Sequence, residues 1–241
     1  MNVFLSKDDE SWLWQRRLAH ILTNHLNKLK SKELVFGLRN IKLQNNRLCD
    51  AYVKGKQTRV SFKIKDIISS NKPLDVLHMD LCGPSRNASL VGNYYAFVIM
   101  DDFSRYTWTL FLVSKNDAFK KLAKILQDEN GCSIKSIHSD HGRKFQNDRF
   151  DRFCEKHEIT HSYSTPRTPQ QNDVVERKNR SLEELVRTML NGSNLLKYLW
   201  EDVVYTASYV LNKTLIKPIL KKTPYEIYKG RKPSISHLRV L

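Results

Sequence analysis

The chain has 241 residues, of which 40% are hydrophobic, and it carries 41 Lys and Arg against 25 Asp and Glu, a formal net charge of +16. A chain of this length can build one sizeable core and a small accessory module; its hydrophobic residues argue against disorder, and its charge favours a polyanionic partner. No run reaches the roughly 18 apolar residues of a membrane span, and the N-terminus does not resemble a signal peptide.

The N-terminal part of the chain predicts a small helical module. Leucine, isoleucine and tryptophan residues recur at helical spacing over 10–31 and predict an amphipathic helix. The residues that follow are basic and poorly periodic, and they contain the break SSNKP. We therefore place the module at 10–58 and a linker at 59–72.

From Leu74 onward the sequence predicts a mixed sheet flanked by helices. Three successive apolar segments separated by turn residues predict strands, and helices and strands then alternate before two final helices, which is typical of an α/β fold. The predicted elements are strands at 74–81, 93–103, 107–113, 134–140 and 159–165, and helices at 116–129, 147–158, 170–191 and 195–213. The core thus covers 73–213, and a basic C-terminal tail follows at 214–241.

Three acidic residues stand out by their positions in these elements. Asp80 ends the segment LDVLHMD, Asp140 ends IKSIHSD, and Glu176 lies near the start of a long helix, 35 residues beyond Asp140. Two carboxylates at strand ends and one on a helix can converge at one edge of a sheet. Such a cluster repels itself unless a divalent cation binds, so it suggests a hard-metal site. Spacing alone leaves open that the two aspartates are turn or cap residues and that the glutamate is solvated.

Four segments, HMDLCGP, DDFSRYTW, HSDHGRKF and TPQQNDVVERKNR, resemble the integrase core of copia-type retrotransposons. The similarity covers about residues 12–241, and the last segment is long and specific. The resemblance implies a ribonuclease-H-like fold and a polynucleotidyl transferase that holds two Mg²⁺ (or Mn²⁺) ions. In that family one ion activates an attacking 3′-hydroxyl or water, and the other stabilises the leaving oxygen of a phosphodiester. Asp80, Asp140 and Glu176 would be the metal ligands and the catalytic residues.

Residues around Glu176 are candidates for binding DNA. Asn172 lies one helical turn before Glu176 and Arg180 one turn after it, so both share its face of the helix. Asn172 could orient a phosphate or a water, and Arg180 could hold a DNA phosphate, as sequence-independent contacts do. Lys178 joins them as an expected DNA contact. Asn172 and Arg180 could equally be ordinary surface residues.

Other polar residues lie close to the predicted carboxylates. Asp101 and Asp102 end the second strand and predict a turn, and a supporting role for Asp101 beside the site stays open. His138 alternates with Asp140 along one strand face and could approach the site, although such a histidine is more often packed or exposed. Asp173 stands where the family has Gly, and it either adds repulsion near the helix-borne ligand or stabilises the first helical turn.

The N-terminal zinc module that the resemblance also implies is degenerate in this chain. Structural zinc needs four Cys or His ligands, and the matching positions hold Gln15, His20, Cys49 and Tyr52. His25 could replace the missing histidine, but nothing obvious replaces the second cysteine. We therefore expect His20 and Cys49 to be remnants of a site without stable zinc, and the helical module to be loosely attached.

The sequence leaves two main functions open. The first is a retrotransposon integrase that performs 3′-end processing and strand transfer on DNA. It would act as a homo-oligomer in the nucleus, after import from a cytoplasmic particle, and four scattered cysteines agree with a reduced intracellular compartment. The second is a catalytically silent, nucleic-acid-binding relic of a retrotransposon polyprotein, which the degenerate zinc module and the ends of the chain would suit. A ribonuclease H shares the fold but does not explain TPQQNDVVERKNR.

Overall fold

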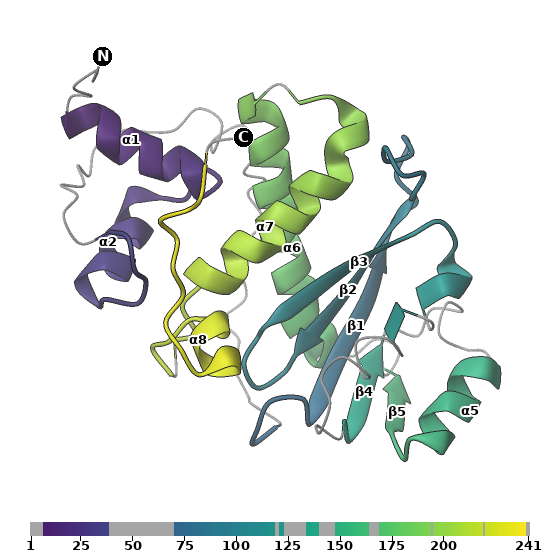
Figure 1. The fold of residues 1–241 in the computed structure, drawn as a ribbon. Coiled ribbons are helices and arrows are strands. Elements are labelled where there is room, and N and C mark those ends of the chain that lie inside the picture. The colour runs from purple at the N-terminus through teal and green to yellow at the C-terminus, as the bar shows by residue number, and fades with distance from the viewer. Residues whose placement is uncertain are drawn as a thin grey trace.

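A computed structural model describes residues 7–38, 70–118, 121–122, 134–139, 148–163, 169–193, 195–218 and 220–239. At its centre lies a five-stranded sheet in the order β3-β2-β1-β4-β5 (Figure 1). The strands are β1 (Val76–Cys82), β2 (Tyr95–Asp101), β3 (Thr107–Leu112), β4 (Ser136–Ser139) and β5 (Thr160–Tyr163). Strands β1, β2 and β3 pair antiparallel, whereas β1 pairs parallel with β4 and β4 with β5. The predicted mixed sheet is confirmed.

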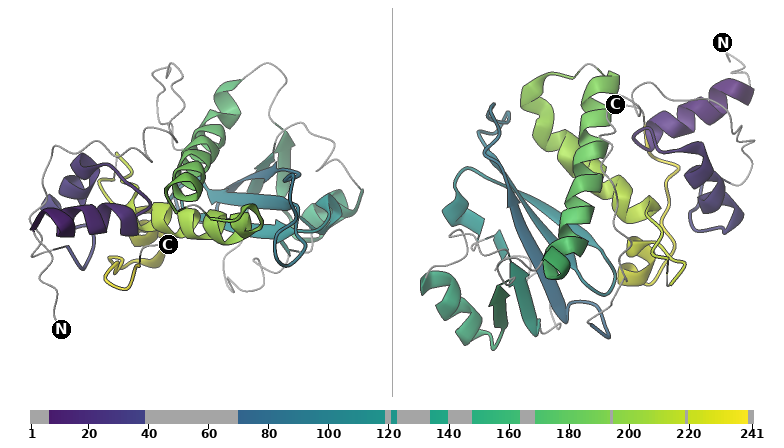
Figure 2. Two further views of the ribbon diagram at one scale, coloured as in Figure 1. Left: turned by 90° about the horizontal axis from the view of Figure 1, so that it is seen from above. Right: turned by 180° about the vertical axis from the view of Figure 1, so that it is seen from behind.

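Helices cover both faces of this sheet (Figures 1 and 2). On one face, Leu77 of β1 clusters with Phe150 of α5; on the other, Val98 of β2 clusters with Leu182 of α6 and Val203 of α7. The helices are α1 (Lys7–Arg17), α2 (Thr23–Ser31), α5 (Asp148–Lys156), α6 (Pro169–Ser193), α7 (Trp200–Thr214) and α8 (Pro224–Lys229), with 3-10 turns at Lys115–Asp117 and Lys197–Leu199. Within the described ranges, none of these helices has the length and apolarity to cross a membrane.

Strand β1 divides its side chains between the two faces. Leu77 and Leu81 belong to the apolar cluster with α5. Successive side chains of a strand point to opposite faces, so the alternating residues His78 and Asp80 face α6. Asp80 also lies opposite Val98 in the β1–β2 ladder, and Val98 itself packs in the cluster with α6. The sheet therefore presents a polar stripe of β1 to the helix that carries Glu176.

The N-terminal module consists of two helices where a single one was predicted over 10–31. Helix α1 closes with a bond of 2.8 Å from the backbone N–H of His20 to the carbonyl of Gln15. Ala19 and His20 then adopt positive φ angles of 57° and 60°. Such left-handed residues cannot continue a right-handed helix, so the chain turns and starts again as α2. The helical spacing of apolar residues persists because both helices pack into one core.

The module packs on the rest of the chain through apolar side chains, so the expected loose attachment is wrong. Trp14 and Leu18 of the module share a hydrophobic cluster with Val210 of α7 and with Ile235 and Leu238 near the C-terminus. Figure 2 shows α1 and α2 beside the C-terminal segment, at the opposite end of the molecule from α5. The segment predicted as a basic tail therefore contributes core residues.

Hydrogen bonds fasten the C-terminal segment at the same place. The N–H of Phe36 donates to the carbonyl of Pro233 at 3.0 Å, and the N–H of Ile235 donates to the carbonyl of Phe36 at 3.1 Å. The buried ammonium of Lys213 in α7 donates to the carbonyl of Ser234 at 3.0 Å. The N-terminal module, α7 and the C-terminal segment thus form one packed unit.

We expect Ile235→Ala to lower the free energy of unfolding by about 2–5 kcal/mol, because it removes a side chain that is fully buried in this unit. Urea denaturation of the full chain would measure the change. Val91→Ala, at a residue that is 78% exposed, is the control and should leave the midpoint almost unchanged. Equal midpoints for Ile235→Ala and the unaltered chain would show that the C-terminal segment is not part of the core.

Candidate active site

Asp80 is held between β1 and α6. Its carboxylate accepts a hydrogen bond of 2.6 Å from the side-chain amide of Asn179 and one of 2.7 Å from the backbone N–H of Leu81. Asn179 is only 6% exposed and Asp80 is half-buried, so the bond that joins strand and helix is partly shielded from water. These contacts fix the orientation of the Asp80 carboxylate at the α6 face of the sheet.

The parallel pairing of β1 with β4 leads towards the second predicted ligand. Met79 lies opposite Ser139, the last residue of β4. Asp80 follows Met79 in the chain as Asp140 follows Ser139. Asp140 itself lies outside the described residues. The structure therefore brings the end of β4 beside Asp80 and leaves the position of the second carboxylate a prediction.

Glu176 belongs to α6, as the sequence predicts for its helix. It precedes Asn179 by three residues, a spacing that places two residues on the same face of a helix. The structure does not describe the side chains of Glu176 and Asn172. The metal-ligand role of Glu176 and the DNA contact of Asn172 therefore stay predictions.

The two remaining predicted DNA contacts differ in exposure. Arg180 is exposed on α6, where a phosphate can reach it, whereas Lys178 is 7% exposed. Burial, and then the charge of Arg105, lower the pKa of Lys178 to about 7. Its ammonium has no hydrogen-bond partner in the described part of the chain. A direct phosphate contact by Lys178 stays a prediction, and it requires the ammonium to leave this buried position.

Asp101 and Asp102 build a buried turn at the end of β2. Asp101 accepts hydrogen bonds from the backbone N–H groups of Leu74 and Ser104, both at 2.8 Å, and from the Ser104 hydroxyl. Burial raises the pKa of Asp101, and these hydrogen bonds oppose the rise. The predicted turn is thus present. The open role of Asp101 beside the metal ligands gains no support, because its carboxylate oxygens serve this turn.

Asp102 is the centre of a polar network that the sequence did not reveal. Its carboxylate accepts hydrogen bonds from Arg105 at 2.7 Å, from Ser70 at 3.0 Å and from His78 at 3.2 Å. All four residues are buried. The ring of His78 in turn stacks on that of His138, with centroids 5.4 Å apart. This network therefore joins the end of β2 to the polar stripe of β1.

His138 is packed, which is the commoner of the two roles considered for it. Its Nδ1 lies 2.7 Å from the hydroxyl of Ser162 in β5. Burial lowers its pKa, as does the charge of the neighbouring His78, whereas Asp102 raises it. These contacts make His138 part of the sheet packing.

Of the four positions that match zinc ligands in the family, the structure describes the first two. Gln15 and His20 are buried, and burial and the charge of Arg16 lower the pKa of His20. The Nε2 of His25 lies 2.7 Å from the carbonyl of Thr214 in α7, so His25 donates there. Cys49 and Tyr52 lie outside the described residues. His25, the candidate replacement ligand, thus serves to attach the module to α7.

Asn179 is the site residue that the sequence reasoning missed. A signal for it exists: it stands three residues after Glu176, so the same helical spacing that singled out Arg180 also selects Asn179. Its partner on the strand could not be read from the sequence, because the two residues are 99 positions apart. Only the packing of α6 on β1 brings them together.

Comparison with known proteins defines the class first. The integrase core domain family matches residues 70–169, and the GAG-pre-integrase domain family matches residues 1–57. The fold is similar to a chain in the structure of the simian T-cell lymphotropic virus intasome in complex with PP2A regulatory subunit B56 gamma. The match has a TM-score of 0.54 and 18% identity, and it covers 67% of this chain and 56% of that chain. The fold is thus that of an integrase catalytic core.

Sequence relatives narrow the class to a family. The Pol polyprotein of transposon TNT 1-94 from Nicotiana tabacum is 34% identical over 95% of this chain and 17% of the polyprotein. That of transposon RE2 from Arabidopsis thaliana is 30% identical over 94% of this chain and 15% of the polyprotein. The chain therefore spans less than a fifth of these relatives. It belongs to the copia-type retrotransposon integrases.

We expect Lys178→Met to stabilise the protein near pH 6, and the gain to shrink towards about pH 9. The folded pKa of about 7 lies below the ordinary 10.5, so between these values the unfolded chain binds a proton that the folded chain does not. The stability of the unaltered chain therefore rises with pH across this window, whereas methionine does not titrate.

Urea midpoints measured in EDTA at both pH values test this expectation. Lys197→Met, at an exposed lysine, is the control and should show no pH-dependent difference. A gain from Lys178→Met that is the same at both pH values would contradict the buried, weakly basic lysine.

Proposed function

We propose that this chain catalyses DNA integration, by 3′-end processing and strand transfer of phosphodiesters, with Asp80, Asp140 and Glu176 as catalytic residues. One observation carries the proposal: Asn179 ties Asp80 to α6 at 2.6 Å, three residues after Glu176. The β1–β4 register, which ends one residue before Asp140, supports the convergence of all three carboxylates at this edge.

The residues of this edge suit Mg²⁺ or Mn²⁺. Carboxylate oxygens are the ligands that such hard cations prefer, and each oxygen has two lone pairs, so the bonds from Asn179 and Leu81 are compatible with metal binding by Asp80. When bound, the metal ions would activate the attacking hydroxyl and stabilise the leaving oxygen. The part of the protein is to hold the carboxylates in place. Asn179 does this for Asp80, and the exposed Arg180 is placed to hold a DNA phosphate.

We further propose DNA as the partner, a homo-oligomer as the active form and the nucleus as the place of action. The net charge of +16 favours a polyanion. The viral neighbour named above is part of an intasome, which supports an assembly for this chain as well. Element ends and target DNA would be the two substrates of such an assembly.

A strand-transfer assay with Mg²⁺ on oligonucleotides that carry element ends tests the catalytic proposal. We expect Glu176→Gln to lose about 100-fold or more of the activity, because it removes a metal ligand. Asn179→Ala should lose about 10- to 100-fold, because it frees the orientation of Asp80. Glu183→Gln is the matched control on the same helix, where Glu183 makes an exposed pair with Arg187.

Two results would contradict this assignment. Full activity of Glu176→Gln would sink the proposed mechanism. An unaltered chain that binds DNA but transfers no strand would instead identify the silent relic.

We also propose that the module folds without zinc. Its apolar cluster with α7 and the C-terminal segment, together with the bond from His25 to Thr214, provides the attachment that metal would otherwise supply. Metal analysis of the purified chain should find zinc far below one ion per chain, and EDTA should leave the urea midpoint unchanged. One zinc per chain, or a lower midpoint in EDTA, would prove the proposal wrong.

A further inference from the structure

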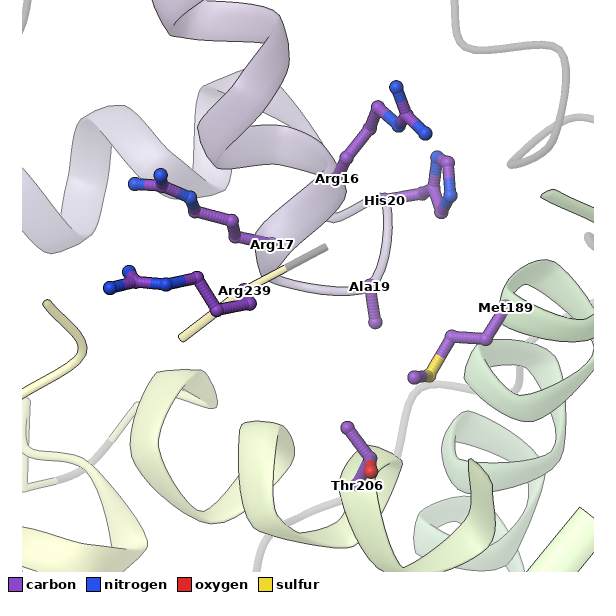
Figure 3. Close-up of a pocket in the computed structure, with 7 residues that line it drawn as sticks. All are labelled: Arg16, Arg17, Ala19, His20, Met189, Thr206 and Arg239. Carbon is purple, nitrogen blue, oxygen red and sulfur yellow. The ribbon is translucent and has the colours of Figure 1, made fainter. Parts of the chain in front are cut away.

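A pocket lies where the N-terminal module meets α6 and α7 (Figure 3). It is a shallow depression that is open to solvent, so a ligand would bind at its rim and not inside a cavity. Ala19, Met189 of α6 and Thr206 of α7 form its neutral lining. Met189 follows Asn179 by ten residues in the helix, which places it about 15 Å along the helix axis from the bond to Asp80.

The charged lining of this pocket is entirely basic. Arg16 and Arg17 come from the end of α1, Arg239 comes from the C-terminal segment, and the buried His20 stands beside them. None of the three arginines forms an ion pair with a carboxylate of the described residues. Three positive charges therefore lie around this pocket without a counter-charge from the described parts of the protein.

The hydrogen-bonding capacity of these arginines is largely unused. The Nε of Arg17 is buried and has no hydrogen-bond partner in the described ranges. Arg239 makes only long contacts, of 3.4 Å to the carbonyl of Ser236 and 3.5 Å to that of Leu238. Arg16 and Arg239 are exposed, so their guanidinium groups have donors that an external acceptor can reach.

The backbone beside the pocket is strained as well. Ala19 and His20 both have positive φ, a conformation that costs energy in residues other than glycine and that gathers at functional sites. Favourable interaction with the carboxyl end of α1 accounts for arginines at positions 16 and 17. It does not account for Arg239, which joins them from the other end of the chain.

The arrangement of the guanidinium groups indicates the ligand. Figure 3 shows Arg17 and Arg239 extending to the same side, with Arg16 and His20 on the other side of the turn that carries Ala19. Guanidinium groups bind phosphate in a bidentate manner. Charges on two sides of a turn suit a ligand with successive phosphates better than a single phosphate ion.

We propose that this pocket is a second DNA-contact site, which holds phosphodiester groups of a duplex whose reacting end lies at the carboxylate edge. This proposal rests on the proposed function, because it takes the bound phosphate groups to be those of the DNA substrate. The distance along α6 corresponds to about four to five phosphate steps of one strand, at 3.4 Å per step, so one duplex can reach both places. Bound phosphates would also bridge Arg16 and Arg17 of the module to Arg239.

The test measures duplex binding by fluorescence anisotropy in EDTA, between about 50 and 200 mM salt. The variant is the double substitution Arg16→Gln and Arg239→Gln, and the control is Arg86→Gln and Arg231→Gln. All four arginines are exposed and both variants lose two charges, and Arg17, which packs over Trp14, is left intact so that folding is preserved. Urea midpoints confirm that both variants fold.

We expect the pocket variant to bind duplex roughly 10-fold more weakly. The slope of log K against log salt should fall in magnitude by about 1–2, because each phosphate contact contributes about 0.9 to that slope. The control should change the slope by less than half as much. Equal losses in the two variants would show a general charge effect and overturn the proposal.

A second arm separates DNA from a free phosphate compound. Tripolyphosphate should compete with duplex for the unaltered chain only weakly. Strong protection of the unaltered chain by tripolyphosphate against thermal unfolding, with duplex affinity unchanged in the pocket variant, would assign the site to a small polyanion and overturn the DNA source. The measurements need no Mg²⁺ and can be repeated with Glu176→Gln, so failure here is distinct from failure of strand transfer.

Discussion

The packing of α6 on the polar stripe of β1 is the constraint on which the site depends. The second half of the helix carries an apolar stripe, and its residues Leu182 and Met189 are buried with Val98 of the sheet. That burial sets the height and rotation of the whole helix. The first half, which carries Glu176, is then positioned as part of the same rigid rod, and the bond from Asn179 to Asp80 fixes its register on the strand.

Two charged side chains are buried near this contact, Asp102 and Lys178, and only the first has hydrogen-bond partners in the described ranges. Asp102 receives bonds from Arg105, His78 and Ser70, so its desolvation is matched by good partners. Lys178 lies within this region without such a partner in the described ranges, and Arg105 only adds like charge. An apolar residue at this helix position would pack at lower cost. The buried lysine is thus unfavourable for stability, and it lies two residues from Glu176. Such departures from stable packing are expected at functional sites.

The sequence predicted what is local and missed what depends on packing between distant segments. Strand β1, with Asp80 near its end, and helix α6, with Glu176 near its start, follow from apolar patterns that any short window contains. The break at Ala19 was missed because helical spacing continues across it, and periodicity does not distinguish one helix from two that share a core. The partner of Asp80, the bonds of Ser70 and His78 to Asp102, and the docking of Ile235 on the module join residues that are far apart in the chain, and no local pattern encodes them.

The attachment of the module also changes how the degenerate zinc site should be understood. In a small zinc domain, metal binding is itself the source of folding free energy, so losing ligands unfolds the domain. Here Trp14 and Leu18 bury their side chains against Val210 and Ile235, which belong to the rest of the chain. The hydrophobic energy of that shared core does not depend on Gln15 or any other ligand position. We therefore expect α1 and α2 to stay folded without the zinc ligands, and because they pack on the core, the arginines at the end of α1 keep a defined position relative to α6.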